Sequence, residues 1–549
     1  MIGPISAFGS PSVRSVIPPL ILLVVLLFAG RAGHSYLVTG AIYDEPHHIA
    51  AGMEWLVKGV YKYETKHPPI ARVLFALPLY LKGIRSQGLA ILPDEGNAIL
   101  KSNGEYRQNL LLARLGNIPF LLITVWAIFL WSARWFSRPT ALVALFLLLN
   151  LPTVIGHFSV ATTDFSQAAT LLLAAYATLR WSEDQTARST ILLGLAISLA
   201  ILCKLSNLFF VLLILLVVLG LRWWQRKSPP LALRQISRDT LIILVIVMVV
   251  ICVAYRFYSP PLSVKQGHHP LLDQRIPHGS LLSRIAYLAV ETPSPFNSFI
   301  SGINEVRNHN RTGHLSYLLG EVRMDGWWYF FPLVLLLKTP LAILVLFLLF
   351  LFTLFKNRRS AQPDGRLTLL AISTSILLFS MTSNINAGVR HILSIYFFLA
   401  LALSDFIVTQ FRMKSHLRPL LGILLLMFGY ESLEAGSDHI GYFNRLAGSR
   451  PERILDESDL DWGQGIYQLS QYLEEKGVSK VSLVYFGTAP LDQVGLPPLE
   501  SARIEEGKTK GYVAVSTHYL AVPYSQYQWL NRYQPIHRIG NTFNIYFFE

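Results

Sequence analysis

One polar segment near the N-terminus interrupts an otherwise apolar chain: residues 42–75 read IYDEPHHIAAGMEWLVKGVYKYETKHPPIARVLF. An acidic pair, Asp44 and Glu45, is followed by two histidines, and a Lys-His-Pro-Pro turn comes about twenty residues later. Ionisable side chains are costly in or near a membrane and usually mark functional positions. The segment is therefore the first candidate for a functional site.

The composition is that of a membrane protein. The chain has 549 residues, of which 52% are hydrophobic and 15% charged, whereas soluble proteins carry about 25% charged residues. Its net charge of +14 is explained by Lys and Arg collecting in cytoplasmic loops, with phosphate-bearing lipids as a second explanation. We expect no nucleic-acid partner. Cys203 and Cys252 both lie in apolar runs, which indicates neither a disulfide framework nor a metal site.

Eleven apolar stretches approach the length of about 20 residues that a membrane-spanning helix needs. They occur at about 17–37, 109–131, 138–157, 161–180, 189–205, 206–222, 240–258, 329–355, 367–384, 388–410 and 417–433. The first is a signal-peptide core or a spanning helix, and both send the following chain to the outside. Residues 189–222 are interpreted as two helices, because a single straight helix would bury the polar stretch 204–207 in lipid.

The loop charges predict the orientation of this bundle. Sixteen Lys and Arg residues fall in the short connections on one side, whereas the short connections on the other side contain only Lys204 and Arg390. Basic residues collect on the cytoplasmic side. We therefore predict that the two long loops, at about 38–108 and 259–328, lie outside the cytoplasm.

The character of the chain changes after residue 433. Residues 465–477 have a helical pattern, residues 480–487 and 511–517 read as strands, and residues 536–548 read as a hairpin around Gly540 and Asn541. The sequence thus predicts a membrane domain over 1–433 and a small outer α/β domain over 434–549.

This topology brings the unusual polar residues to the outer side. Carboxylates there could deprotonate an acceptor, and cations could hold a phosphate. Each residue also has a purely structural interpretation: Asp164 could cap its helix, Arg390 could extend to the lipid headgroups, and the histidines lack the spacing of a metal motif. The predicted site residues are Asp44, Glu45, His47, His48, Lys66, His67, Asp164, Lys204, Lys338, Arg390 and His391.

The order of these motifs resembles that of the GT-C membrane glycosyltransferases, in particular the protein O-mannosyltransferase and lipid A aminoarabinose transferase group. The resemblance extends over about residues 20–430 and includes the acidic pair, the Lys-x-Pro-Pro turn with His67 inserted, and the aspartate that begins the fourth span. It also includes KLSN, LLLKTPLAILV and GVRHILSIYFFLALA. The stretch 442–473 resembles an extension in a bacterial branch, so we expect a bacterial inner-membrane protein with a site facing the periplasm.

The resemblance implies that a sugar passes from a polyprenyl-phosphate carrier to a hydroxyl group, with inversion at the anomeric carbon. Asp44 is then the expected general base, and Glu45 positions the acceptor or Asp44. Arg390 is the first candidate for the carrier phosphate, because its planar fork matches phosphate bidentately. Further candidates for donor binding are Lys338, Lys204, Lys66 and His391, while His47, His48 and His67 are assigned to the acceptor or to a structural loop.

A monophosphate carrier held by enough cations requires no metal, so no cofactor is expected to be required. A divalent ion between Asp44 and Asp164 is the alternative. The sugar and the acceptor, which is a protein, a lipid or a glycan, are left open. The rival class is a transporter or flippase of lipid-linked sugars; such folds usually contain internal repeats and broken helices, and no repeat is visible in this sequence.

Overall fold

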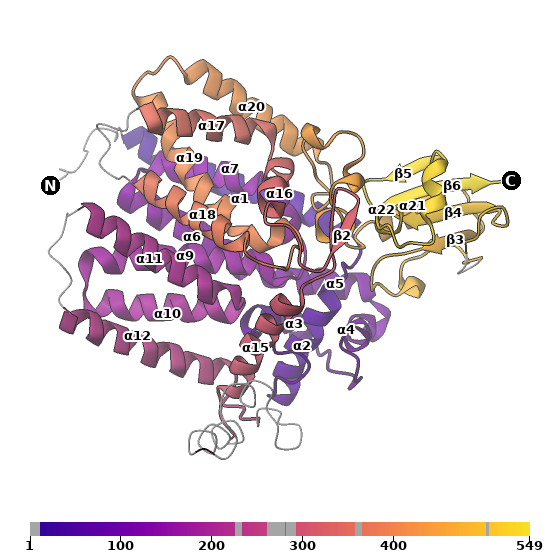
Figure 1. Cartoon of the computed structure of the whole chain (residues 1–549), viewed down its shortest axis with the longest axis horizontal. Coiled ribbons are helices and arrows are strands. Elements are labelled where there is room, and N and C mark those ends of the chain that lie inside the picture. The colour runs from indigo at the N-terminus through magenta and orange to yellow at the C-terminus, as the bar shows by residue number, and fades with distance from the viewer. Residues whose placement is uncertain (1–10, 226–232, 261–279, 281–292, 357–364, 501–503) are drawn as a thin grey trace.

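The molecule has two parts, a bundle of helices and a small sheet domain at one end of that bundle (Figure 1). The computed structural model describes residues 11–225, 233–260, 280, 293–356, 365–500 and 504–549. Part of the second long loop predicted from the sequence, namely 261–279 and 281–292, lies outside these residues.

Each of the predicted apolar segments is helical. The prediction of a helical membrane protein is therefore confirmed, although the helices differ in how well each alone could cross a membrane. Among the described residues, five helices are long and apolar enough, or up to seven spans if two bent pairs each count as one. The helices are α1 (Pro11–Val38), α5 (Tyr106–Arg114) with α6 (Ile118–Trp135), α7 (Arg138–Leu149) with α8 (Pro152–Phe158), α9 (Thr163–Asp184), α10 (Ala187–Cys203), α11 (Ser206–Gln225), α12 (Leu233–Ala254), α16 (Phe330–Lys338) with α17 (Leu341–Lys356), α18 (Gly365–Ser380), α19 (Ser394–Arg412) and α20 (Arg418–Glu434).

Two segments expected to be single spans are broken. The chain bends by 74° between α7 and α8 and by 114° between α16 and α17. Proline follows each break, at Pro152 and Pro340, and proline both lacks an N–H and disfavours helical geometry in the residue before it. Leu151 and Thr339 accordingly adopt extended backbone conformations. Lys204 is extended as well, which confirms that 189–222 forms two helices.

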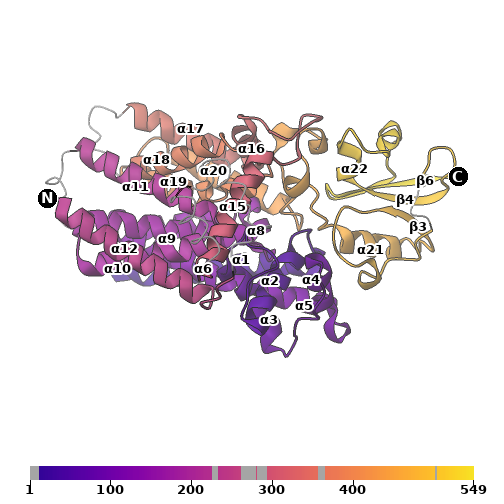
Figure 2. The same cartoon turned by 60° about the horizontal axis from the view of Figure 1, so that its bottom comes forward.

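Three short helices cover the bundle at the end that carries the sheet domain (Figure 2). They are α2 (Glu45–Lys58), α3 (Pro69–Leu81) and α4 (Leu92–Lys101). Two glycines allow this close packing: a Cβ at Gly52 would lie 2.0 Å from the carbonyl oxygen of Arg72, and one at Gly96 would lie 2.0 Å from that of Pro46. The segment around the acidic pair is therefore compact.

Between α12 and α16 the structure describes α15 (Asn297–Thr312) and a two-stranded antiparallel hairpin, β1 (Ser316–Leu318) with β2 (Glu321–Arg323). The short 3-10 turn η3 (Val389–Ile392) precedes α19.

The C-terminal domain has one four-stranded sheet in the order β3-β4-β6-β5. β3 (Val481–Val484) runs parallel to β4 (Gly511–Ser516), which pairs antiparallel with β6 (Phe543–Phe548), and β5 (His537–Ile539) completes the sheet. With α21 (Ile466–Glu475) and α22 (Thr517–Ala521), these elements confirm the helix, the two strands and the hairpin predicted from the sequence.

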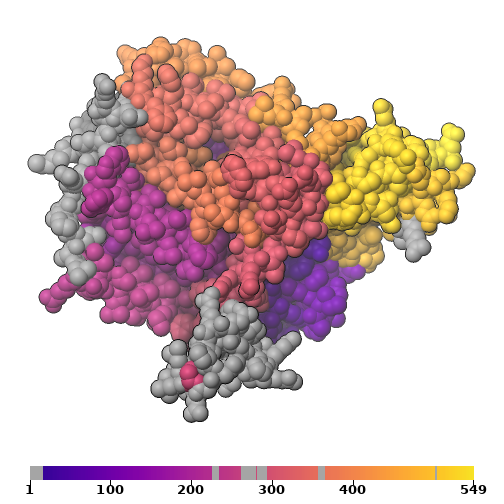
Figure 3. Space-filling view, viewed as in Figure 1, coloured from indigo at the N-terminus to yellow at the C-terminus, as the bar shows by residue number. Residues whose placement is uncertain are grey.

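Residues 435–464, which we call the connecting segment, join α20 to α21. They were predicted as part of the outer domain, yet many of their side chains are buried, including those of His439, Asn444, Asp459, Asp461 and Trp462. The space-filling view shows the C-terminal part of the chain in continuous contact with the helical part (Figure 3). The connecting segment thus packs into the end of the helix bundle.

The predicted orientation is tested by thiol labelling of a variant in which Cys203 and Cys252 are replaced by alanine. A cysteine at the exposed position Glu474 in α21 should react with an impermeant maleimide in intact cells. A cysteine at Ala187, exposed at the start of α10, should react only after the cells are permeabilised. The opposite pattern would place the candidate site in the cytoplasm and contradict the orientation.

Candidate active site

Asp44 and Arg390, which are 346 positions apart in sequence, form an ion pair. The pair lies at the end of the helix bundle that carries the C-terminal sheet domain. Asp44 immediately precedes α2, and Arg390 lies in η3. Nη1 of Arg390 lies 2.6 Å from Oδ2 of Asp44, and the two side chains are 18% and 29% exposed. Burial opposes the charge of Arg390, but Asp44 and Asp164 outweigh it and raise the arginine pKa. The predicted base and the predicted phosphate ligand therefore face each other, both reachable from solvent.

Arg390 keeps part of its hydrogen-bonding capacity. Its Nε donates to the carbonyl oxygen of Ala387 at 3.0 Å, and its Nη1 donates to Asp44. Within the described part of the chain, Nη2 makes no hydrogen bond. A guanidinium with one open N–H edge is suited to binding an anion such as phosphate.

A second ion pair lies beside the first. Nζ of Lys204, at the end of α10, donates to Oδ1 of Asp164 in the first turn of α9 at 2.5 Å. Arg390 lies within electrostatic range of the same aspartate. Asp164 does not cap its helix, because the N-cap residue is Thr162. The structure thus brings together four of the predicted residues from four different parts of the chain.

Glu45 has a different environment from its neighbour Asp44. Its carboxylate is fully buried and accepts from Nε and Nη2 of Arg114 at 2.8 and 2.9 Å. It also accepts from the backbone N–H groups of Ala161 and Ile42 at 2.8 and 3.0 Å. Glu45 was predicted to position the acceptor or Asp44. Its carboxylate is occupied by groups of the protein, which leaves no room for an acceptor and favours the second role, because these contacts fix the loop that carries Asp44.

Arg114 was not among the residues predicted from the sequence. This side chain is fully buried and also donates to the carbonyl oxygens of Gly40 and Thr39 at 2.7 and 3.1 Å. A lone arginine inside the apolar stretch 109–131 was a detectable signal, since charges in such positions are rare and usually paired.

Two of the four predicted histidines belong to a largely buried network. Nε of Arg72 donates to Nδ1 of His48 at 2.9 Å, and the same arginine pairs with Glu64, which in turn binds Nδ1 of His67 at 2.9 Å. Burial lowers the pKa of His48 and of His67, so both rings are neutral near pH 7. They hold the turn before α3, which agrees with the structural alternative. Sequence reasoning missed Arg72 and Glu64.

Three predicted residues remain, namely His47, Lys66 and His391. His47 is partly exposed, donates from Nδ1 to the carbonyl oxygen of Tyr43 at 3.1 Å, and stacks on the Tyr43 ring. Lys66 is partly exposed, and its ammonium has no partner within the described residues. Burial and the nearby Lys204 and Arg390 hold the pKa of His391 well below its usual range, so His391 can offer a hydrogen bond but no charge.

Lys338 does not take part in the cluster. Its side chain is buried, and its ammonium donates to the carbonyl oxygens of Ile440 and Asp459 at 2.7 and 2.5 Å. The ring of Phe443 covers the ammonium at 4.3 Å. The prediction that Lys338 binds the donor phosphate is therefore corrected, because two of its three N–H groups are directed at the connecting segment and the Phe443 ring covers the ammonium.

The alternative prediction places a divalent ion between Asp44 and Asp164, and such an ion would need further ligands. In the described ranges there is no group of three or more His, Cys, Asp or Glu side chains placed to hold a metal ion. Each of the two carboxylates is instead neutralised by a basic side chain.

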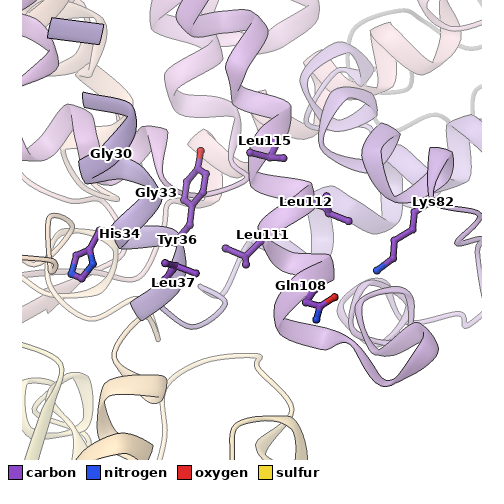
Figure 4. A pocket seen from close by; sticks show the side chains of 10 residues that line it. All are labelled: Gly30, Gly33, His34, Tyr36, Leu37, Lys82, Gln108, Leu111, Leu112 and Leu115. Carbon is purple, nitrogen blue, oxygen red and sulfur yellow. The ribbon is translucent and has the colours of Figure 1, made fainter. Parts of the chain in front are cut away.

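A separate groove lies between α1 and α5 (Figure 4). It is open and has a volume of about 780 Å³. Leucines of α5 and the end of α1 form most of its wall, and Lys82 lies at its rim (Figure 4). None of the predicted site residues lines this groove.

One segment of the helical part matches a family model. Residues 107–255 fit the model described as dolichyl-phosphate-mannose-protein mannosyltransferase. The S. cerevisiae protein O-mannosyltransferase Pmt1–Pmt2 complex, bound to the sugar donor, aligns with a TM-score of 0.51 at 12% identity, over 77% of this chain and 90% of that one. The chain has a GT-C glycosyltransferase fold.

Two further solved structures are similar to this chain. ArnT from Cupriavidus metallidurans bound to undecaprenyl phosphate aligns over 96% of this chain and 97% of that one, with 12% identity and a TM-score of 0.49. The oligosaccharyltransferase AglB from Archaeoglobus fulgidus aligns over 91% and 71%, with 10% identity and a TM-score of 0.45. No curated protein matches the chain. The family match includes Asp164 and Lys204 but neither Asp44 nor Arg390.

The buried Glu45–Arg114 pair generates a stability prediction. Arg114→Met leaves the carboxylate of Glu45 buried without its partner, which typically costs about 3–5 kcal/mol. The midpoint of thermal unfolding in detergent should fall clearly, whereas Lys508→Met, at an ion pair whose lysine is 78% exposed, should leave it unchanged. Glu45→Gln combined with Arg114→Met should recover part of the loss. An unchanged midpoint for Arg114→Met would mean that the pair does not hold the loop.

Proposed function

We propose that the protein transfers a sugar from a polyprenyl-phosphate carrier to a hydroxyl acceptor at the Asp44–Arg390 site, on the outer face of the membrane and with inversion. The observation that carries this proposal is the contact between one carboxylate and one guanidinium at the domain end of a GT-C bundle. Transfer of this kind needs a base for the acceptor and a cation for the leaving group, and this pair supplies both.

The chemistry divides between the two partners. Asp44 accepts the proton of the acceptor hydroxyl as its oxygen forms a bond to the anomeric carbon. The bond between that carbon and the phosphate oxygen breaks, and its electron pair stays on the phosphate. Arg390 stabilises the charge that develops there, because a positioned cation in a poorly solvated site acts strongly on the transition state. Lys204 adds positive charge near Arg390, since both act on Asp164, and Lys66 is a further candidate for binding the donor.

Inversion requires this ion pair to open during the reaction. The attacking oxygen and the leaving phosphate must lie on opposite faces of the anomeric carbon, so the sugar ring separates the base from the phosphate. The 2.6 Å contact between Asp44 and Arg390 is then the resting state, in which each charge neutralises the other until the donor phosphate binds to Arg390.

The rival function, transport of a lipid-linked sugar, gains no support from the broken helices. In transporters, freed backbone groups at such breaks line a substrate or ion site. Here the connecting segment occupies the break between α16 and α17: Nδ2 of Asn444 donates to the carbonyl oxygens of Leu336 and Thr339, both at 2.7 Å. The backbone carbonyls freed at this break are bound by the protein itself and not left open to a substrate or ion. These contacts therefore support sugar transfer better than transport.

Asp44→Asn keeps the shape of the side chain but removes its ability to accept a proton. Transfer of labelled sugar from a panel of polyprenyl-phosphate sugars in isolated membranes should fall at least about a hundredfold, the lower range for loss of general-base catalysis. Asp94→Asn, at an exposed position in α4, is the matched control and should behave as wild type. Asp164→Asn should also lower activity. Near-normal transfer by Asp44→Asn would assign the base to another group.

Arg390→Lys keeps one charge but loses the planar fork, so we expect a higher KM for the donor and slower transfer. Arg390→Ala should be worse, because a hydrogen bond to a charged group contributes about 1.5–3 kcal/mol, or tenfold and more. The control is Arg323→Lys, since Arg323 lies on the exposed strand β2, where its guanidinium stacks on Trp327. Free exchange of Arg390 for lysine would show that it only anchors the chain at the interface.

A further inference from the structure

The turn that carries Arg390 is held by the connecting segment. Oδ1 of Asp459 accepts from the backbone N–H of Val389 at 2.9 Å, and Oγ of Ser458 donates to the carbonyl oxygen of Ala387 at 2.9 Å. Between these two contacts, Gly388 has a φ of +87° and leaves no room for a side chain, since a Cβ would lie 2.5 Å from Oγ of Ser458. Residues 456–464 therefore fit closely against η3.

Trp462 contacts both halves of the candidate site. The guanidinium carbon of Arg390 lies 4.5 Å from the centre of the Trp462 ring. The carbonyl oxygen of the same tryptophan accepts from the backbone N–H of Tyr43, the residue before Asp44, at 3.0 Å. The tryptophan is 3% exposed. Trp462 thus contacts Arg390 through its ring and, through its backbone carbonyl, the residue that precedes Asp44.

A ring face suits this role better than a hydrogen-bonding side chain. The negative potential of the indole face attracts the guanidinium without using any of its N–H groups. The flat contact also restricts the plane of the guanidinium, and that plane decides whether two N–H groups can meet a phosphate together. Trp462 therefore orients Arg390 while leaving Nη2 open.

The residues around Trp462 are anchored on two sides. On the bundle side, Lys338 donates to the carbonyl oxygens of Asp459 and Ile440. On the side of the C-terminal domain, Nδ1 of His518 in α22 lies 2.7 Å from Oδ2 of Asp456. The position of Trp462 consequently depends on both parts of the molecule.

We propose that residues 456–464 form one wall of the donor-phosphate site and that Trp462 is the positioning residue for Arg390. This inference rests on the proposed function and deepens it, because it gives the C-terminal extension a role in binding the lipid-linked donor. Lys338 also contributes to this wall. Its ammonium holds the carbonyl of Asp459, and Asp459 in turn holds the turn that carries Arg390.

The test measures binding of undecaprenyl phosphate to the purified full-length protein in detergent, together with kinetics of transfer. Trp462→Leu keeps an apolar side chain but removes the aromatic face, and we expect affinity for undecaprenyl phosphate to fall at least about tenfold, the loss expected for a desolvated cation–π contact. Trp462→Phe should restore most of it. The matched control is Trp529→Ala, at a tryptophan that packs within the C-terminal domain on Tyr533 and Phe548.

A double-variant cycle separates a positioning role from a structural one. If Trp462 acts through Arg390, then adding Trp462→Leu to Arg390→Ala should cause little further loss of affinity, since contacting residues are strongly non-additive. Additive losses, or wild-type affinity in Trp462→Leu, would overturn the inference while leaving the proposed function intact. Failure of the wild-type protein to bind undecaprenyl phosphate would overturn the proposed donor class and the inference with it.

Discussion

The fully buried ion pair between Glu45 and Arg114 fixes the positions of the segments around the candidate site. Neither charge could remain in a dry interior alone, because an unpaired buried ion is strongly destabilising. Arg114 also binds carbonyl oxygens just after α1, and Glu45 binds the N–H of Ala161 just before α9. The pair thus joins α1, α2, α5 and the start of α9 at one point. Asp44, by contrast, is partly exposed at the site.

A second constraint comes from the prolines that break two helices. Each break frees backbone groups, which must find partners in a region that water does not reach. The two breaks meet, since Oγ1 of Thr153 donates to the carbonyl oxygen of Lys338 at 3.0 Å. Asn444 and the ammonium of Lys338 satisfy the groups at the second break and at the connecting segment. Backbone hydrogen bonding therefore draws the C-terminal extension into the bundle, next to Arg390.

The charges of the site are arranged in neutral pairs. Asp44 with Arg390 and Asp164 with Lys204 each cancel locally, which keeps the cost of partial burial low. Such an arrangement is stable without ligand and still responds to one, because a phosphate competes with Asp44 for the guanidinium. In the proposed mechanism, binding of the donor phosphate to Arg390 therefore frees Asp44 to act as the base.

The sequence by itself determined the helical membrane architecture, the GT-C resemblance and the elements of the C-terminal sheet, because these follow from local periodicity and composition. It also identified Asp44, Asp164, Lys204 and Arg390 as residues of one region. Only the tertiary structure decided how these residues pair, that Glu45 and Lys338 bind groups of the protein itself, and that Arg114, Arg72 and Trp462 contact predicted residues. The physical reason is that a charge near a membrane must find a partner, yet the partner is set by packing between segments up to hundreds of residues apart, which no local pattern records.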